Sequence, residues 1–288
     1  MNRPALFGIS ILLMLGCLNG CSTRTAPLVI GDWSRGLSIA SRENPDMRTF
    51  LYFFEWHMFD AILPGMHTQA FYRPGEWPRE GIWALFNRNI NADSSYGVMS
   101  KADMKLEFTS VDDGVEMQLT IKNTSQHDWP EAASIIPCFN PGFPNNRNEA
   151  FVDKDSSCTY YVGASGLTLL TNRAIHFNNT YRNEIEQLRT ANGGSFLQND
   201  FDNKWPTAGD DARAGVMIRE SHYKQWVWGV AWNDFLSAQG HNPLFCMHLS
   251  VRVGPLKRGE EKQVTGKVYL FQGTKEECYE RYLRDFAS

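Results

Sequence analysis

Apolar and polar residues alternate over several stretches of this chain, and this two-residue period restricts the fold more than any other feature. The clearest stretch is MKLEFTSVDDGVEMQLTIKN, residues 104–123. Apolar residues occupy every second position on both sides of Asp112-Asp113-Gly114, a sequence typical of a tight turn. The segment therefore predicts a β-hairpin with one buried face.

The same alternation recurs in LFCMHLSVRVG (244–254), KQWVWGVAWND (224–234) and GKVYLF (266–271). In the first of these, His248 and Arg252 share the polar face. Further candidate strands lie near 67–72, 80–87, 132–139, 158–163, 167–171 and 214–221. So many short strands predict a mainly β protein, built as a large antiparallel two-sheet sandwich.

Two terminal helices are expected in the same domain, which we place at residues 44–288. At 274–286, Thr274 and Glu277 have the spacing of a capping box. At 44–64, Asn44-Pro45-Asp46 resembles a helix start, and apolar residues recur at spacings of three and four. A further helix is expected in TYRNEIEQLRTANGG, residues 180–194.

The motif FFEWHMFD, residues 53–60, has two readings. On a strand, Glu55 and His57 would point the same way and could share a ligand. On a helix, residues two apart point about 200° from each other. Because the spacing of apolar residues predicts the helix, we do not expect a Glu-His metal pair.

The N-terminus has the pattern of a lipoprotein export signal. Arg3 precedes a short apolar stretch, ALFGISILLMLG, which is too short for a stable membrane anchor. Leu18-Asn19-Gly20-Cys21 resembles the lipobox of bacterial lipoproteins, which implies a signal peptide at 1–21, lipidation at Cys21 and a tether and lead-in at 22–43. Ser22 then implies the outer membrane of the cell envelope. Two alternatives stay open: a competing box that ends at Cys17, and an ordinary cleaved signal peptide.

Composition excludes some partners and motifs. The net charge is -4 with mixed signs, so nucleic acid is not expected as a partner. The sequence contains no CxxC pair, P-loop, HExxH or GxSxG motif. We therefore expect no cofactor and no metal site. Among the mature cysteines, Cys138 and Cys158 are candidates for one disulfide.

A family resemblance rests on GVEMQLTIKNTSQHDWPEAASIIPCFNPG and GPLKRGEEKQVTGKVYLFQG. An alternating strand that ends in Asn-x-Ser, followed by an aromatic residue, resembles the β-supersandwich of galactose-mutarotase-like proteins. Asn123, Ser125 and Trp129 match that pattern. The resemblance spans about residues 65–272 and implies a carbohydrate or polysaccharide ligand. IIPCFNPG contains no histidine where the epimerases carry one, so the family's catalytic residues are not assigned here.

Candidate site residues follow from the polar faces of the strands. Histidine suits general acid-base catalysis and arginine suits a substrate carboxylate, as in lyase or epimerase chemistry on uronic sugars. The candidate catalytic residues are His241, His248, Arg219 and Arg252. The candidate sugar-binding residues are Trp226, Trp228, His67 and Trp205, since indole rings stack on sugars. The tryptophans have an alternative role as packing core.

Three functional classes stay open from the sequence. The protein is an enzyme acting on carbohydrate, a glycan-binding module without turnover, or a structural envelope protein. Turnover that depends on His241 or His248 would favour the first class.

Overall fold

The fold is a mainly β sandwich of two antiparallel sheets. A computed structural model describes residues 27–33, 36–58, 73–74, 82–90, 102–141, 149–191, 206–241 and 245–287. In spatial order, the seven-stranded sheet contains β1 (Leu28–Trp33), β2 (Gly36–Ser41), β3 (Arg48–Met58), β8 (Ser134–Asn140), β15 (His248–Arg252), β14 (Phe235–Gln239) and β11 (His176–Phe177).

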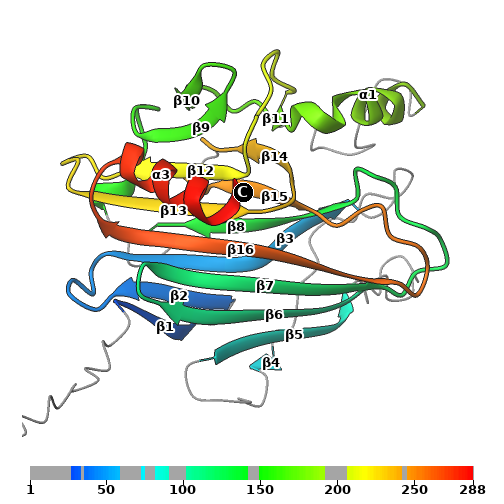
Figure 1. The fold of residues 1–288 in the computed structure, drawn as a ribbon, viewed down its shortest axis with the longest axis horizontal. Helices are drawn as coiled ribbons and strands as arrows, with labels where there is room; N and C mark the ends of the chain where they lie inside the picture. The colour runs from blue at the N-terminus through cyan, green and yellow to red at the C-terminus, as the bar shows by residue number, and fades with distance from the viewer. Residues whose placement is uncertain are drawn as a thin grey trace, which may run out of the picture.

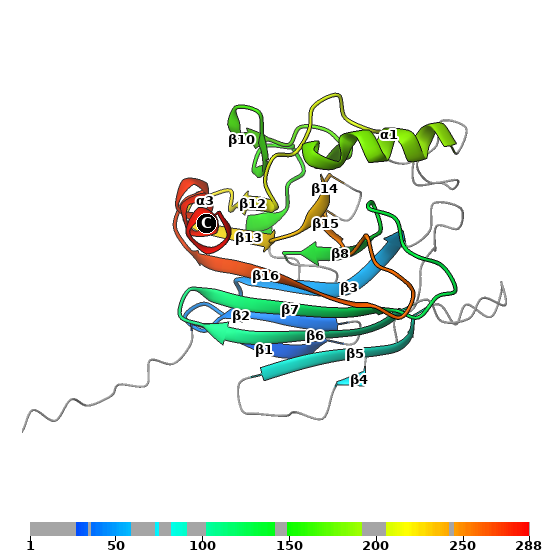
Figure 2. The same ribbon diagram turned by 45° about the vertical axis from the view of Figure 1, so that its right-hand side comes forward.

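The second sheet has nine strands. Its spatial order is β10 (Gly166–Leu169), β9 (Thr159–Gly163), β12 (Val216–Glu220), β13 (Trp226–Trp232), β16 (Glu261–Gln272), β7 (Gly114–Asn123), β6 (Ala102–Val111), β5 (Ile82–Ile90) and β4 (Arg73–Pro74). Figures 1 and 2 place β4 and β5 at one end of the molecule and α1 (Arg182–Ala191) and β10 at the other. The predicted hairpin is confirmed as β6 and β7, paired from Ala102–Asn123 to Val111–Gly114.

The main core lies between the two sheets. Leu106 and Leu119 contribute from one sheet, and Leu51 and Leu249 contribute from the other. Phe139 of β8 and Trp228 of β13 meet across the interface with ring centroids 5.5 Å apart. Each such side chain contributes about 1.5–3 kcal/mol through burial, so the alternating apolar face explains the sandwich.

The C-terminal helix is confirmed as α3 (Lys275–Phe286), and it covers the far side of β12 and β13 (Figure 1). Both hydrogen bonds of the Thr274–Glu277 capping box form. Cys278 and Tyr282 are its buried residues, whereas Leu283 is exposed. Gly229 of β13 allows this packing, since a Cβ there would lie 2.6 Å from the Cys278 sulfur.

The helix predicted at 44–64 is wrong over residues 48–58, which form strand β3. Residues 44–47 are a turn instead, in which the Met47 amide donates to the Asn44 carbonyl oxygen. Asn, Pro and Asp favour turns as well as helix starts, and β3 pairs with β2 and β8 on its two sides. Tertiary pairing thus overrides the helical spacing. Glu55 and His57 therefore lie two positions apart on a strand; their side chains lie outside the described part.

The predicted helix near 180–194 is confirmed as α1, with a 3-10 turn (Asn179–Tyr181) before it. Asn178 caps this 3-10 turn, because its side chain accepts from the Thr180 amide. A further 3-10 turn spans Glu149–Phe151. None of the described helices is long and apolar enough to cross a membrane.

The Asn-x-Ser motif forms the corner after β7. The Asn123 side chain donates to the carbonyl oxygens of His127 (2.8 Å) and Leu256 (2.9 Å). Its own oxygen accepts from the Ser125 amide and hydroxyl, and the Trp129 indole donates to that hydroxyl at 3.2 Å. The motif thus holds the turn that joins the two sheets, since Asn123 lies in one sheet's strand and the chain then enters β8 of the other.

Candidate functional site

Five polar side chains gather on the outer face of the seven-stranded sheet, the face turned away from the main core. The pairs Phe139–Met247 and Val251–Ile135 fix the register of β8 and β15. That register places His248 beside Cys138 and Cys246 beside Asn140. Gln239 of β14 pairs with His248 on the other side. We call Cys138, Asn140, Gln239, Cys246 and His248 the polar patch.

The polar patch is buried and internally hydrogen-bonded. Nδ1 of His248 lies 2.7 Å from Oε1 of Gln239, and Nδ2 of Asn140 donates to the Cys246 sulfur at 3.3 Å. All five residues are less than a tenth exposed. Buried polar groups are destabilising unless they are paired, so Asn140, Gln239 and His248 on one face, beside two thiols, point to a function beyond packing.

The same face is apolar further along β8. Ile136 packs there with Ile185 of α1 and with Phe177 and Leu236. The change from this apolar contact to the polar patch occurs within one strand, between Ile136 and Cys138. The polar patch is therefore confined to one end of the neighbouring strands β8, β15 and β14.

A second buried group, the Arg219 cluster, consists of Arg219, Thr159, Asp153 and His241. Arg219 Nε donates to the Thr159 hydroxyl at 2.8 Å, and that hydroxyl donates to Asp153 Oδ2 at 2.5 Å. Nε2 of His241 lies 3.8 Å from the same carboxylate oxygen. Arg219 Nη1 also donates to the Phe245 carbonyl oxygen at 2.7 Å, next to Cys246 of the polar patch. The two groups are neighbours.

Charge stabilises the Arg219 cluster. Burial raises the pKa of Asp153, but hydrogen bonds from Thr159 and Ser157 and the charges of Arg219 and His241 outweigh it and hold that pKa below its usual range. Burial lowers the pKa of Arg219, whereas Cys158 and Asp153 oppose that effect. The carboxylate is ionised in the folded protein at neutral pH, and the guanidinium stays charged because its ordinary pKa is very high.

The structure brings three of the four predicted catalytic residues to this end of the sandwich: Arg219, His241 and His248. It does not offer Arg219 to a substrate carboxylate. Its side chain is fully buried, and Nε and Nη1 already donate to Thr159, Phe151 and Phe245. The expected role of Arg219 in holding substrate is therefore corrected: it ties together the loops around β9 and β15.

Arg252 lies apart from the other three. It is four residues beyond His248 on β15, or about 13 Å along the strand. There it makes a two-bond contact with Asp234, at 2.7 and 2.8 Å, and its guanidinium stacks on Tyr181. The strand does place Arg252 and His248 on one face, but Arg252 is engaged by protein groups.

The predicted sugar-stacking role of the tryptophans is also corrected. Trp226 and Trp228 belong to the main core between the sheets, and Trp228 is fully buried. Their face of β13 points toward the other sheet, so packing takes the surface that a sugar would need. His67, Trp205 and Cys21 lie outside the described residues.

Sequence reasoning missed Cys138, Asn140 and Gln239 as site residues. Cys138 and Asn140 lie on β8 and Gln239 lies on β14, and Asn140 and Cys246 are 106 residues apart in sequence. The sequence also offered Cys138 and Cys158 as candidates for a disulfide. This disulfide does not form, since Cys158 is a buried free thiol. Burial and nearby Asp153 raise the pKa of Cys158 to about 12.

A histidine that the sequence did not single out, His176, is buried at the sandwich edge. Its ring packs at a tilt against Tyr161, with ring centroids 4.2 Å apart, and Nδ1 lies 3.4 Å from a carboxylate oxygen of Asp210. Tyr161 donates to the other Asp210 oxygen. Burial lowers the pKa of His176, although Asp210 opposes this, so the ring is neutral at pH 7.

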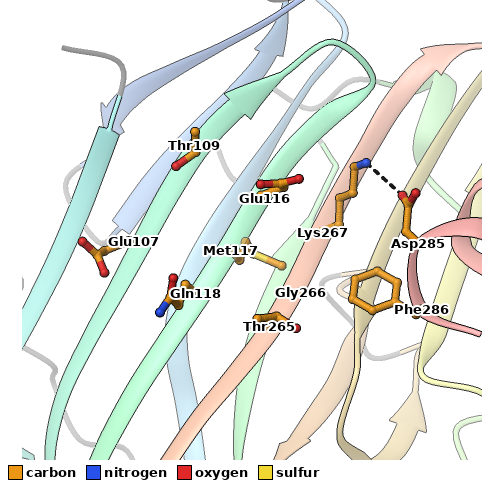
Figure 3. A pocket seen from close by; sticks show the side chains of 10 residues that line it. All are labelled: Glu107, Thr109, Glu116, Met117, Gln118, Thr265, Gly266, Lys267, Asp285 and Phe286. Atoms are coloured by element: carbon orange, nitrogen blue, oxygen red, sulfur yellow. Dashed lines mark hydrogen bonds and ion pairs between the residues drawn. The ribbon is translucent and has the colours of Figure 1, made fainter. Parts of the chain in front are cut away.

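A shallow hollow of about 470 Å³ lies elsewhere, on the outer face of the nine-stranded sheet beside the end of α3 (Figure 3). Lys267 extends along its rim to Asp285, 2.8 Å away, and also pairs with Asp113 at 2.6 Å. These contacts join α3 to the sheet. The lining residues are Glu107, Thr109, Glu116, Met117, Gln118, Thr265, Gly266, Lys267, Asp285 and Phe286.

No protein-family model matches the sequence, and no curated protein matches it significantly. Among solved structures, the chain is similar to a galactose mutarotase-like protein from Lactobacillus casei, with 10% identity and a TM-score of 0.43 over 84% of this chain and 99% of that one. A galactose mutarotase related enzyme from Lactobacillus acidophilus shows 10% identity and a TM-score of 0.45 over 87% and 97%.

The chain is also similar to a polysaccharide lyase, with 8% identity and a TM-score of 0.44 over 91% of this chain and 34% of the lyase. The two Lactobacillus proteins are described as galactose-mutarotase-like or related, the kind of protein that the sequence resembles. The sandwich itself is established by its strand order.

Proposed function

We propose that this protein binds carbohydrate at the rim of the polar patch, whose five residues are each less than a tenth exposed. The observation that carries the proposal is the side-by-side placement of Asn140, Gln239 and His248 on one face of the seven-stranded sheet. Carboxamides and imidazole both donate and accept hydrogen bonds, which matches the paired hydroxyl groups of a sugar ring. The sequence resemblance to galactose-mutarotase-like proteins supports the same ligand class.

The chemistry of the patch favours a neutral sugar over a uronic one. Recognition of a carboxylate calls for a guanidinium that is free to form two parallel bonds. Arg219 is committed to Thr159, Phe151 and Phe245, and Arg252 is committed to Asp234. The ligand that fits is therefore a neutral saccharide.

A second candidate function is sugar epimerisation or a related proton transfer, with His241 as general acid-base. The observation behind it is the contact of His241 with Asp153, at 3.8 Å, beside the Ser156 hydroxyl at 3.4 Å. The Asp153 carboxylate and the Leu170 carbonyl oxygen both face Nε2 of His241, which fixes the orientation of the ring. Arg219 would then act as a positioning residue that holds Asp153 through Thr159.

The binding proposal is tested with neutral and uronate-containing oligosaccharides and isothermal titration calorimetry. We expect binding of a neutral oligosaccharide and about tenfold weaker binding for Asn140→Ala or Gln239→Ala, the size of one lost hydrogen bond. Gln225→Ala, at an exposed carboxamide just before β13, is the matched control. Unchanged affinity in both patch variants, or binding of uronic sugars alone, would contradict the proposal.

The two candidate functions differ in turnover. NMR of the bound sugar over prolonged incubation shows whether the product differs from the substrate. A product that disappears in His241→Ala while binding persists supports the enzyme. Binding without product supports a glycan-binding module. If no glycan binds, the result supports the third class, a structural envelope protein.

We also propose that the protein is exported and anchored to the outer membrane through lipidated Cys21. Support comes from the lipobox-like sequence at 18–21 and from Ser22. Mass spectrometry of the mature N-terminus tests this. We expect a diacylglyceryl-modified Cys21, lost in Cys21→Ala, and an unmodified N-terminus at another residue would contradict it.

A further inference from the structure

Two cysteines and a histidine converge in the middle of the polar patch. The sulfur atoms of Cys138 and Cys246 and a ring nitrogen of His248 all lie within 4.8 Å of one another, and all three residues are buried. Cys246 lies just before β15 and projects from the same face of the sheet as His248. Cys138 projects beside them from β8. The arrangement is therefore fixed by the backbone of two paired strands.

The three ligand types suit a soft or borderline metal ion. Thiolate and imidazole bind Zn²⁺ at about 2.3 and 2.0–2.1 Å, which in a tetrahedral site separates the ligand atoms by roughly 3.3–3.8 Å. The observed separations, up to 4.8 Å, need only small side-chain movements to reach that geometry. No carboxylate belongs to the group, so Ca²⁺ and Mg²⁺ do not fit.

The surrounding residues support metal binding. With Gln239 Oε1 accepting from Nδ1 of His248, the imidazole keeps its lone pair on Nε2. Metal-bound histidines usually have such an oxygen on the second ring nitrogen, which fixes their tautomer. Asn140 donates to the Cys246 sulfur, and Arg219 lies within electrostatic range of the same cysteine. Both groups offset the negative charge of a buried thiolate.

We propose that Cys138, Cys246 and His248 form a binding site for one Zn²⁺ ion. Two thiolates and a neutral imidazole give a complex without net charge, which is the favourable state for a buried site. Three protein ligands leave the fourth tetrahedral position for water or an added ligand. The inference does not depend on the carbohydrate proposal, because the ion is measured without any sugar.

A disulfide between Cys138 and Cys246 is the competing use of the same sulfurs. In the register of β8 and β15 the two cysteines are diagonal neighbours and not directly opposite. Diagonal positions are about 7–8 Å apart, beyond the usual span of a disulfide. The thiols are therefore better placed for a shared ion than for a bond to each other.

The test uses the whole chain purified without chelators. We expect about one zinc per chain by elemental mass spectrometry and, after removal of the metal, a thiolate-to-cobalt charge-transfer band that saturates at one equivalent of Co²⁺. Cys138→Ser, Cys246→Ser and His248→Gln should each weaken binding by at least about tenfold. Cys278→Ser, which changes a buried thiol of α3, is the matched control and should leave binding unchanged.

Thermal unfolding with and without Zn²⁺ gives a readout that does not depend on the variants. The wild-type melting temperature should rise with Zn²⁺, and because both thiols lose protons on binding, the rise should be larger at pH 8 than at pH 6. Less than a tenth of an equivalent of metal together with no cobalt band would overturn the inference. So would an unchanged band in Cys138→Ser, or a Cys138–Cys246 disulfide in the freshly purified protein.

Discussion

His248 of β15 lies beside Cys138 of β8, and two residues further along the strands Cys246 lies beside Asn140, whose side chain donates to the Cys246 sulfur at 3.3 Å. These four residues meet only because β8 and β15 are neighbours in the sheet. Gln239 on β14 completes it by contacting His248. The polar patch is thus a product of strand order.

The Asn123 corner should be one of the most sensitive points in the fold. Asn123→Ala removes two donated bonds and leaves the carbonyl oxygens of His127 and Leu256 without that donor, together with the amide and hydroxyl of Ser125. We expect a loss of about 2–4 kcal/mol in the free energy of unfolding, measured by urea denaturation. Gln118→Ala, at an exposed carboxamide, should lose less than about 0.5 kcal/mol. Equal losses in the two variants would show that the corner is not important.

Gly229 should tolerate a larger side chain only when Cys278 is reduced in size. In Gly229→Ala the new Cβ would lie 2.6 Å from the Cys278 sulfur and 3.2 Å from a Tyr269 ring carbon. We expect a loss of about 1–3 kcal/mol from this overlap. The double variant with Cys278→Ala should lose less than the sum of the two single variants. Gly209→Ala, where a Cβ meets nothing within 4 Å, is the control; additive losses would contradict the packing argument.

The Arg219 cluster should depend on the guanidinium charge. Arg219→Met leaves the Asp153 carboxylate buried without its positive neighbour and removes the donor to Thr159. We expect about 3–5 kcal/mol of destabilisation in urea unfolding. Arg284→Met, at an exposed ion pair with Asp113, should cost at most about 1 kcal/mol. If Arg219→Met matched that control, the cluster would have no structural role.

The buried ring of His176 should make stability depend on pH. Burial lowers its pKa in the folded state, so the unfolded chain binds more protons below about pH 6.5. Stability from this group is therefore present above that pH and falls as the pH drops toward the folded-state pKa. Urea midpoints at pH 7.5 and 5.5 should differ less in His176→Gln than in wild type. His127→Gln, at an exposed ring, should keep the wild-type difference, and an unchanged difference in His176→Gln would contradict the assignment.

Local patterns were sufficient to predict most of the sheets and the last helix. Alternation identified the hairpin of β6 and β7 and the inward face of β13, and the Thr274–Glu277 spacing identified the start of α3. The same reasoning failed at β3, because Asn44-Pro45-Asp46 favours a turn and a helix start equally. What decided between them was pairing with β2 and β8, which no local pattern contains.

The site was harder to predict because its residues meet only through strand order. His248 and His241 were found as polar residues near one strand, but Cys138 and Gln239 have no signal in their own segments. The sequence also does not show how deeply each side chain is buried. Trp228 and Arg219 have side chains typical of binding sites, yet the fold encloses both of them completely.

The most direct test of the carbohydrate proposal is a crystal structure of the chain with the neutral oligosaccharide that binds it most tightly. The account predicts a sugar ring at the outer face of the seven-stranded sheet, with hydroxyl groups within hydrogen-bond distance of Asn140 and Gln239. A sugar bound instead in the hollow beside Asp285 and Lys267, with the polar patch untouched, would contradict it.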